Sequence, residues 1–351
     1  MICRTSHLLA AVLAATTGLC ASAAAQCEGL KLTPPVPQPH AYLSSVALGP
    51  HVLVSGAPGF RKLSGAAFVF DPATGELLHT LTASDPQPLA YFGNAVALHG
   101  GAAVVGAYRT DDVGSAYLFD LTSGLELHRL LPAVPKTNSA FGSDVAIDAD
   151  FVAVGSPGNF PSAPDEGMVH VYDRASGASL HAISSPEPSG VFENTHYFGR
   201  ALDLDGGLLL VGANGPENVG AAYVFDAATG ALLHELLPPP GSDPKNFGFA
   251  LDLHGRLAVV GDSGAFPPRG GAHVYDAITG QLLYSVPGPD SVGGTGFGYS
   301  VAIDGRALAV GAKYQQQGGG HQGRVYVYSS ATGAPAFELD GHPSDPTSQF
   351  G

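Results

Sequence analysis

A Phe-Gly dipeptide recurs along this chain at a nearly constant interval. Successive copies are 49, 57, 49, 50 and 53 residues apart. A constant period of this length means that the chain is built from equivalent structural units, each packed against its neighbours. The copies lie at Phe92-Gly93, Phe141-Gly142, Phe198-Gly199, Phe247-Gly248, Phe297-Gly298 and Phe350-Gly351, and a degenerate copy begins at Tyr42-Leu43.

Each unit contains four short apolar stretches. In "ALDLDGGLLLVGA" (201–213), alternation on both sides of an Asp-Gly turn predicts a β-hairpin. "GAAYVFDAATGALLHEL" (220–236) then supplies a third strand, a turn and a fourth strand. A parallel β-solenoid, the main alternative, needs shorter rungs and no hairpins. Four strands in about 50 residues instead predict an all-β propeller, in which four-stranded blades pack radially around a channel.

The two ends of the chain complement each other. Gly29–Thr33 aligns with a fourth strand that has no first three strands before it, and Phe350-Gly351 begins another copy. A blade built from both termini commonly closes a propeller ring. We therefore expect seven blades and a chain that is a fragment, and the alternative is a six-bladed ring. The propeller is predicted over 26–351, with repeats beginning near residues 42, 92, 141, 198, 247 and 297 and a partial repeat from 350.

The first 25 residues have the pattern of a secretory signal peptide. Arg4 precedes an apolar stretch from Leu8 to Leu19, and small residues at 23–25 precede Gln26. The apolar stretch is shorter than the roughly 20 residues that span a bilayer, so no membrane span is expected. The protein is predicted to be secreted, extracellular or periplasmic. Cys27 is then the only cysteine of the mature chain, which excludes an internal disulfide.

The charge of the chain limits its partners. The net charge is −15 at pH 7, with acidic residues spread along the sequence. Such a surface repels phosphate backbones, so no nucleic-acid partner is expected.

The repeated Phe-Gly, the Gly-Ala-Pro at 56–58 and the Gly-x-x-Tyr-Val-Phe strands together resemble the FG-GAP repeats of integrin-α-like propellers. The resemblance covers residues 42–351 and implies a binding or cell-adhesion role. Blades of this family that bind calcium carry Asp-x-Asp-x-Asp-Gly loops, because calcium takes 6–8 oxygen ligands. The corresponding turns here, such as Asp205-Gly206, are too short. We expect no cofactor, with calcium as the alternative that the family raises.

The "VFDAATGALLHEL" segment also resembles the blade motif of quinoprotein propellers. The chain has no Trp to stack on a quinone, so a dehydrogenase is not expected.

Two sets of repeated polar residues are interpreted as structural. One His lies at the same position of four successive fourth strands, and blade symmetry keeps these side chains from converging on one metal ion. One Asp lies where each third strand enters its turn and is expected to accept backbone N–H bonds there. The sets are His79, His128, His181 and His234, and Asp71, Asp120, Asp173, Asp226 and Asp276.

Loops that interrupt the repeat follow the Gly-Ala elements and are expected to gather on one face of the ring. Function concentrates on such variable loops, and these combine acidic residues with aromatic surface suited to a peptide or sugar. The candidate binding residues are Tyr108, Asp111, Asp112, Phe160, Asp165, Glu166, Glu217, Phe266 and Tyr314.

The sequence therefore predicts an exported, non-catalytic module whose loop face binds a protein or a glycan, in adhesion or surface assembly. One alternative is a hydrolase or lyase with a site in the central channel, for which Asp144, Asp203, Asp252 and Arg200 are the available residues. Another alternative is a structural module of a larger surface protein.

Overall fold

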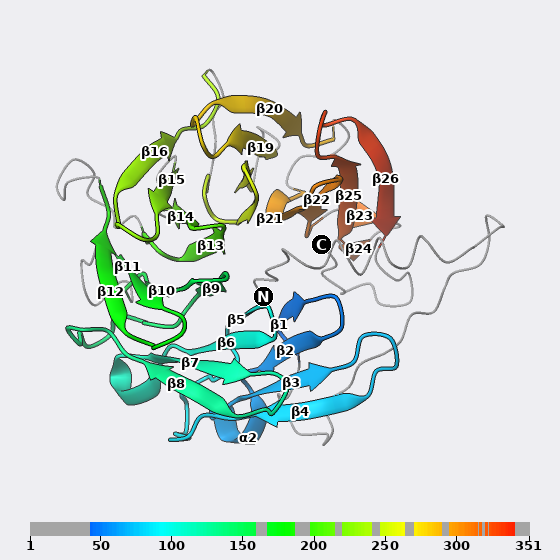
Figure 1. Ribbon diagram of the computed structural model, residues 1–351. Helices are drawn as coiled ribbons and strands as arrows, with labels where there is room; N and C mark the ends of the chain where they lie inside the picture. Colours follow the sequence, from blue (N-terminus) through cyan, green and yellow to red (C-terminus); the bar gives the residue numbers. More distant parts are fainter. Residues whose placement is uncertain are drawn as a thin grey trace.

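The computed structural model describes residues 43–158, 167–186, 197–214, 220–240, 246–263, 270–289, 295–314, 316–317, 320–321 and 323–340. Within these residues, six four-stranded antiparallel sheets are arranged around a ring (Figure 1), which confirms the predicted propeller. We number the sheets as blades 1 to 6 in chain order. The predicted seventh blade falls on residues outside the described ranges and stays a prediction.

In each blade the chain runs outwards, with the first strand nearest the centre and the fourth at the rim (Figure 1). The first strands are β1 (Ser45–Leu48), β5 (Val96–His99), β9 (Val145–Ile147), β13 (Ala201–Asp205), β17 (Leu251–His254) and β21 (Phe297–Ile303). The second strands are β2 (Leu53–Ala57), β6 (Ala102–Ala107), β10 (Phe151–Ser156), β14 (Leu208–Ala213), β18 (Leu257–Asp262) and β22 (Ala307–Ala312).

The outer half of each blade is a second hairpin. The third strands are β3 (Ala66–Phe70), β7 (Ser115–Asp120), β11 (Met168–Asp173), β15 (Ala221–Asp226), β19 (Gly271–Asp276) and β25 (Arg324–Ser329). The fourth strands are β4 (Leu77–Leu81), β8 (Glu126–Leu130), β12 (Ser179–Ser184), β16 (Leu232–Leu236), β20 (Leu282–Pro287) and β26 (Pro335–Asp340). Short elements between blade strands are α2 (Phe60–Leu63), the 3-10 turn η1 (Thr110–Asp112), β23 (Gln316–Gln317) and β24 (Gly320–His321).

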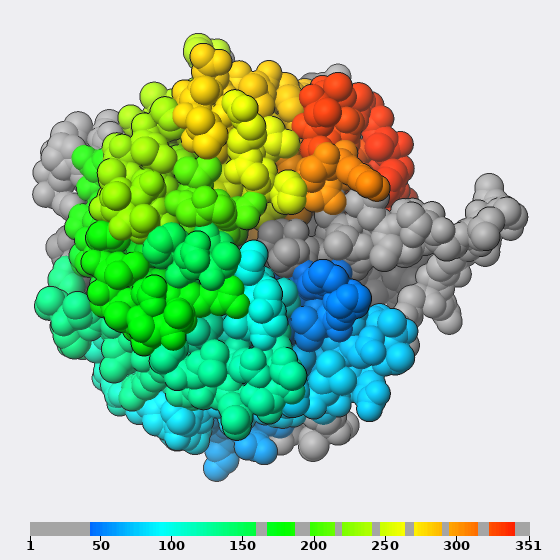
Figure 2. Space-filling view, in the orientation of Figure 1, coloured from blue at the N-terminus to red at the C-terminus, as the bar shows by residue number. Residues whose placement is uncertain are grey.

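The hydrophobic core lies between blades, as expected for sheets that bury both faces. Five apolar clusters each join one blade to the next, from blades 1 and 2 to blades 5 and 6. Figure 2 shows the described blades packed together. Blades 1 and 6 each carry a separate cluster of their own residues, with Phe68 in the first and Val327 in the second. Among the described residues, no helix is long and apolar enough to cross a membrane.

The Phe-Gly dipeptide joins each of blades 2 to 5 to the preceding blade. The Phe92 backbone forms a parallel bridge with Gly65 of blade 1, while its ring lies 5.4 Å from that of Tyr117 and 5.9 Å from that of Phe119 in blade 2. A Cβ on Gly65 would lie 1.9 Å from the Phe92 carbonyl oxygen, so a side chain there would prevent the joint. The same bridges link Gly114 to Phe141, Gly167 to Phe198 and Gly220 to Phe247.

The repeated aspartates stabilise the turns between third and fourth strands, as predicted. Each carboxylate accepts a backbone N–H bond from its own turn, and the Gly that follows adopts a positive φ. The bonds run to Asp71 from Ala73 at 2.7 Å, to Asp120 from Ser123 at 2.7 Å, to Asp173 from Ser176 at 2.8 Å, to Asp226 from Thr229 at 2.7 Å and to Asp276 from Ile278 at 2.9 Å.

Candidate functional site

Each variable loop follows a second strand, and the end of the second strand lies beside the start of the first strand. Phe297 pairs with Ala312, so the residues that follow β22 lie beside the start of β21. We call this end of the ring the loop face. Tyr108, Asp111, Asp112 and Tyr314 follow second strands and lie on it. Phe160, Asp165, Glu166, Glu217 and Phe266 are outside the described residues.

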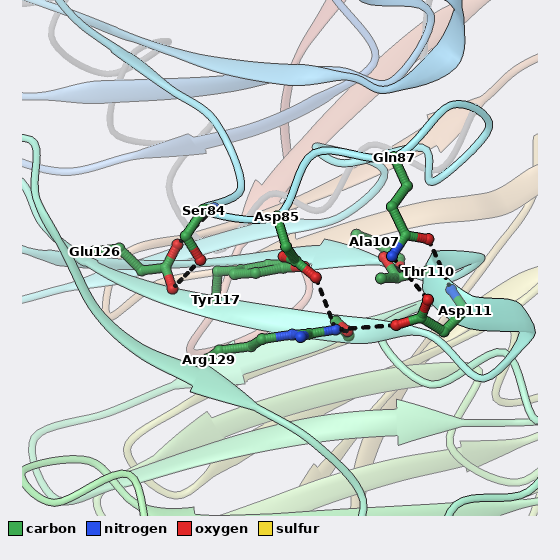
Figure 3. Close-up of polar contacts among 10 residues, drawn as sticks. Ser84, Asp85, Gln87, Ala107, Thr110, Asp111, Tyr117, Glu126 and Arg129 are labelled. Atoms are coloured by element: carbon green, nitrogen blue, oxygen red, sulfur yellow. Dashed lines mark hydrogen bonds and ion pairs between the residues drawn. The ribbon is translucent and has the colours of Figure 1, made fainter.

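Asp111 is part of a polar network rather than an isolated acid (Figure 3). Its Oδ1 accepts a hydrogen bond from Gln87 Nε2 at 2.7 Å, and its Oδ2 lies 3.3 Å from Arg129 Nη2. Arg129 also pairs with Asp85 at 2.9 Å, and Asp85 accepts a bond from the Tyr117 hydroxyl at 2.7 Å. The network ties η1 to the loop that contains Asp85 and Gln87, so Asp111 supports the shape of the loop face. Asp112, next to it, is exposed.

Tyr108 stacks beside Tyr91, with ring centroids 5.3 Å apart and planes 31° apart. The Arg109 guanidinium lies 5.8 Å from the Tyr108 ring and 5.9 Å from the Tyr91 ring. Burial raises the pKa of the Tyr108 hydroxyl. This group is a small platform of two rings and one cation.

A longer arrangement of the same kind crosses blades 4, 5 and 6, and we call it the aromatic–cation strip. Each member contacts the next through a ring. It consists of Tyr197, Arg200, Phe249, Tyr299, Lys313 and Tyr314.

One half of the strip surrounds Arg200. Its guanidinium lies 5.0 Å from the Phe249 ring centroid and 5.6 Å from that of Tyr197. Phe249 in turn contacts Tyr299, with centroids 5.0 Å apart. The Arg200 side chain is half-buried, and this burial lowers the pKa of its guanidinium.

The other half surrounds Lys313. Its Nζ lies 4.4 Å from the Tyr299 ring centroid and 5.3 Å from that of Tyr314, and it donates a hydrogen bond to the Tyr299 hydroxyl at 3.2 Å. Tyr314 is 40% exposed and lies 6.3 Å from Tyr299, centroid to centroid. Tyr314, a predicted binding residue, is thus part of a set whose other five members the loop-based prediction missed.

Three of the five missed residues share one sequence position. Arg200, Phe249 and Tyr299 each directly follow a Phe-Gly dipeptide. The corresponding residues in blades 2 and 3 are Asn94 and Ser143, and Asn94 Nδ2 donates to the Ser143 carbonyl at 2.8 Å. The position after Phe-Gly is therefore polar in blades 2 and 3 but carries an arginine or an aromatic ring in blades 4 to 6. This change in residue type distinguishes one side of the loop face from the other.

The channel carboxylates connect neighbouring blades. Oδ2 of each accepts a backbone N–H bond from the first strand of the next blade, whose inner edge has no further strand to pair with. The bonds run to Asp144 from Leu202 at 3.1 Å, to Asp203 from Leu253 at 2.7 Å and to Asp252 from Ile303 at 2.6 Å. Arg200, the fourth residue considered for channel chemistry, lies in the strip.

Three of the four fourth-strand histidines also link blades. His128 Nε2 lies 3.0 Å from the Ala175 carbonyl oxygen of blade 3, and His181 Nε2 lies 2.7 Å from that of Ala228 in blade 4. His234 contacts the Ile278 carbonyl oxygen in the same way at 2.9 Å. Across the described ranges, no three His, Cys, Asp or Glu side chains gather in a metal-binding arrangement.

Comparison with known proteins agrees with this geometry. The FG-GAP repeat family matches residues 77–119, 126–172 and 288–328. A search of curated proteins found no match. The crystal structure of the computationally designed Ika8 protein is similar with a TM-score of 0.52 and 19% sequence identity, covering 87% of this chain and 88% of that one, a likeness that concerns the fold alone. The matched segments and the ring of blades together show that the chain is a β-propeller that contains FG-GAP repeats.

Proposed function

We propose that this protein is an exported, non-catalytic binding module whose loop face binds a protein or glycan partner at the cell surface. The observation that carries the proposal is the aromatic–cation strip, a continuous set of four rings and two cations on the loop face. Half-buried aromatic side chains bind ligands because they offer large apolar area with little loss of conformational entropy. Export is proposed from the leader at 1–25.

We propose no catalytic role for the acidic residues and the arginine considered for the channel. The carboxylates there already accept backbone hydrogen bonds from the next blade, and the Arg200 side chain lies against rings. General acid–base catalysis needs carboxyl groups directed at a substrate with separated pKa values. The bonds to the neighbouring blade favour a scaffold role for Asp144, Asp203 and Asp252.

The test is a binding screen of the purified protein on immobilised glycans and peptides. Tyr299→Ala removes the ring at the middle of the strip, and we expect it to weaken each genuine interaction at least tenfold. Arg306→Gln is the matched control, because Arg306 is exposed in the β21–β22 turn at the opposite end of the ring. Circular dichroism melting checks that both variants fold. Hits that Tyr299→Ala leaves unchanged, or the absence of any hit, would overturn the proposal.

A further inference from the structure

Arg200 and Lys313 differ from the three arginines that form ion pairs in the described part of this acidic protein. Arg129, Arg256 and Arg324 each pair with carboxylates: Arg129 with Asp85 and Asp111, Arg256 with Asp276, and Arg324 with Glu338 and Asp340. Among the described contacts, neither Arg200 nor Lys313 has a carboxylate partner; both lie over rings instead. Arg109 also lies over two rings, Tyr91 and Tyr108. Arg200 and Lys313 differ from it in that the contacting rings of Phe249 and Tyr299 join these two cations.

The surroundings of these cations favour an incoming carboxylate. Arg200 is half-buried between the Tyr197 and Phe249 rings, which partly desolvates its charge and lowers its pKa. A partly desolvated guanidinium gains more from an anion than an exposed one does. Arginine presents a planar fork that matches the two oxygens of a carboxylate. Lys313 adds a second, point-like charge on the other side of Phe249 and Tyr299.

The rings between the two cations favour a sugar as the carrier of that carboxylate. Phe249 and Tyr299 lie between Arg200 and Lys313, and Tyr314 extends the apolar surface with a partly exposed ring. The C–H face of a pyranose packs against aromatic rings, while its polar edges stay in water. A peptide that binds by adding a strand to a sheet edge uses main-chain hydrogen bonds, whereas the strip consists of side chains.

The length of the strip favours a polymer over a single small anion. Its members come from three successive blades and form a continuous series of contacts in which a cation lies at each end of the Phe249–Tyr299 pair. Resting on the loop-face binding function proposed above, we propose that the strip binds a linear acidic polysaccharide, with sugar rings over Phe249, Tyr299 and Tyr314 and carboxylates at Arg200 and Lys313.

Titration calorimetry at physiological salt with polygalacturonate tests this inference. Fully methyl-esterified polygalacturonate is the matched ligand without charge, and poly-L-glutamate is the matched polyanion without sugar rings. We expect binding of polygalacturonate, at least tenfold weaker binding of the ester, and none of polyglutamate. Arg200→Gln and Lys313→Gln should each weaken polygalacturonate binding at least fivefold, while Arg306→Gln should leave it unchanged. Thermal melting of each variant separates a lost contact from a lost fold.

Three results would overturn the inference in different ways. Equal binding of the acid and the ester would mean that the cations are not used. Binding of polyglutamate without polygalacturonate would assign the strip to an acidic peptide, and the loop-face binding function would stand. Binding of neither polymer, with other strip-dependent hits on the glycan and peptide screen, would reject the acidic polysaccharide alone, whereas a screen without strip-dependent hits would also reject the proposed function.

Discussion

The Asp203 carboxylate of blade 4 accepts a hydrogen bond from the Leu253 backbone N–H of blade 5, with 2.7 Å between Oδ2 and N. Its other oxygen accepts from Leu204 N–H at 2.9 Å in the same strand. One side chain therefore serves two backbone donors and holds two blades in register beside the channel.

Removing this carboxylate should weaken the ring. Asp203→Ala leaves the Leu253 N–H without its partner, and we expect the free energy of unfolding to fall by about 2 kcal/mol, the usual contribution of a hydrogen bond to a charged group. Urea unfolding followed by circular dichroism measures the change. Asp112→Asn, an exposed change on the loop face, is the control and should fall within about 0.5 kcal/mol of the parent protein. An equally small effect of Asp203→Ala would remove the inter-blade role.

A methyl group at the end of a second strand should be far more damaging than one in an open turn. A Cβ on Gly106 would lie 2.1 Å from the Gly142 carbonyl oxygen of the next blade, so Gly106→Ala must push two backbones apart. We expect a loss of more than about 2 kcal/mol, within the range of overpacked cores. Gly305→Ala, where the nearest atom would be 3.6 Å away, should be tolerated. Similar melting temperatures for the two variants would contradict the close approach.

Buried histidines should make the protein sensitive to mild acid. Burial lowers the pKa of His170 to about 4, and that of His273 likewise to about 4. Between about pH 6.5 and 4 the unfolded chain binds protons at these residues and the folded chain does not, so stability falls as the pH falls through this window. The loss is at most about 3 kcal/mol for each histidine.

The variant His170→Phe tests the origin of that slope. Blade 1 has Phe68 at the corresponding position, fully buried, so the ring fits the blade architecture. We expect His170→Phe to flatten the decline of unfolding free energy between pH 6.5 and 4, and His51→Gln, at an exposed turn, to leave it unchanged. An unchanged slope in His170→Phe would place the acid sensitivity elsewhere.

Calcium should not stabilise the protein. In the β9–β10 turn, Asp148 Oδ1 accepts from Asp150 N–H at 2.9 Å and from Phe151 N–H at 2.8 Å, while Oδ2 accepts from Gly207 N–H at 2.8 Å. A calcium ion would have to replace these bonds and still find further oxygens. We expect the same melting midpoint in EDTA and in millimolar calcium. A ligand present at 100 times its dissociation constant adds about 2.7 kcal/mol, so a bound ion would be visible as a rise.

The order and number of strands in the described blades could be predicted from the sequence because both are encoded locally. The period-two pattern and the turn residues of 201–213 specify a hairpin without reference to the rest of the chain. The Asp of each outer turn was also predictable, because Asp226 bonds to Thr229, only three residues away.

The candidate site was only partly predictable, because its contacts join residues that lie far apart in the sequence. Arg200 meets Phe249 and Phe249 meets Tyr299 only when successive blades close around the channel. The sequence offered Asp203 as a residue for channel chemistry, whereas in the folded ring its carboxylate accepts a hydrogen bond from the Leu253 N–H of the next blade. The sequence by itself determined the repeat, the blade and its turns through local periodicity. Tertiary packing alone decided which side chains of different blades face one another, because those contacts depend on the rotation between neighbouring sheets.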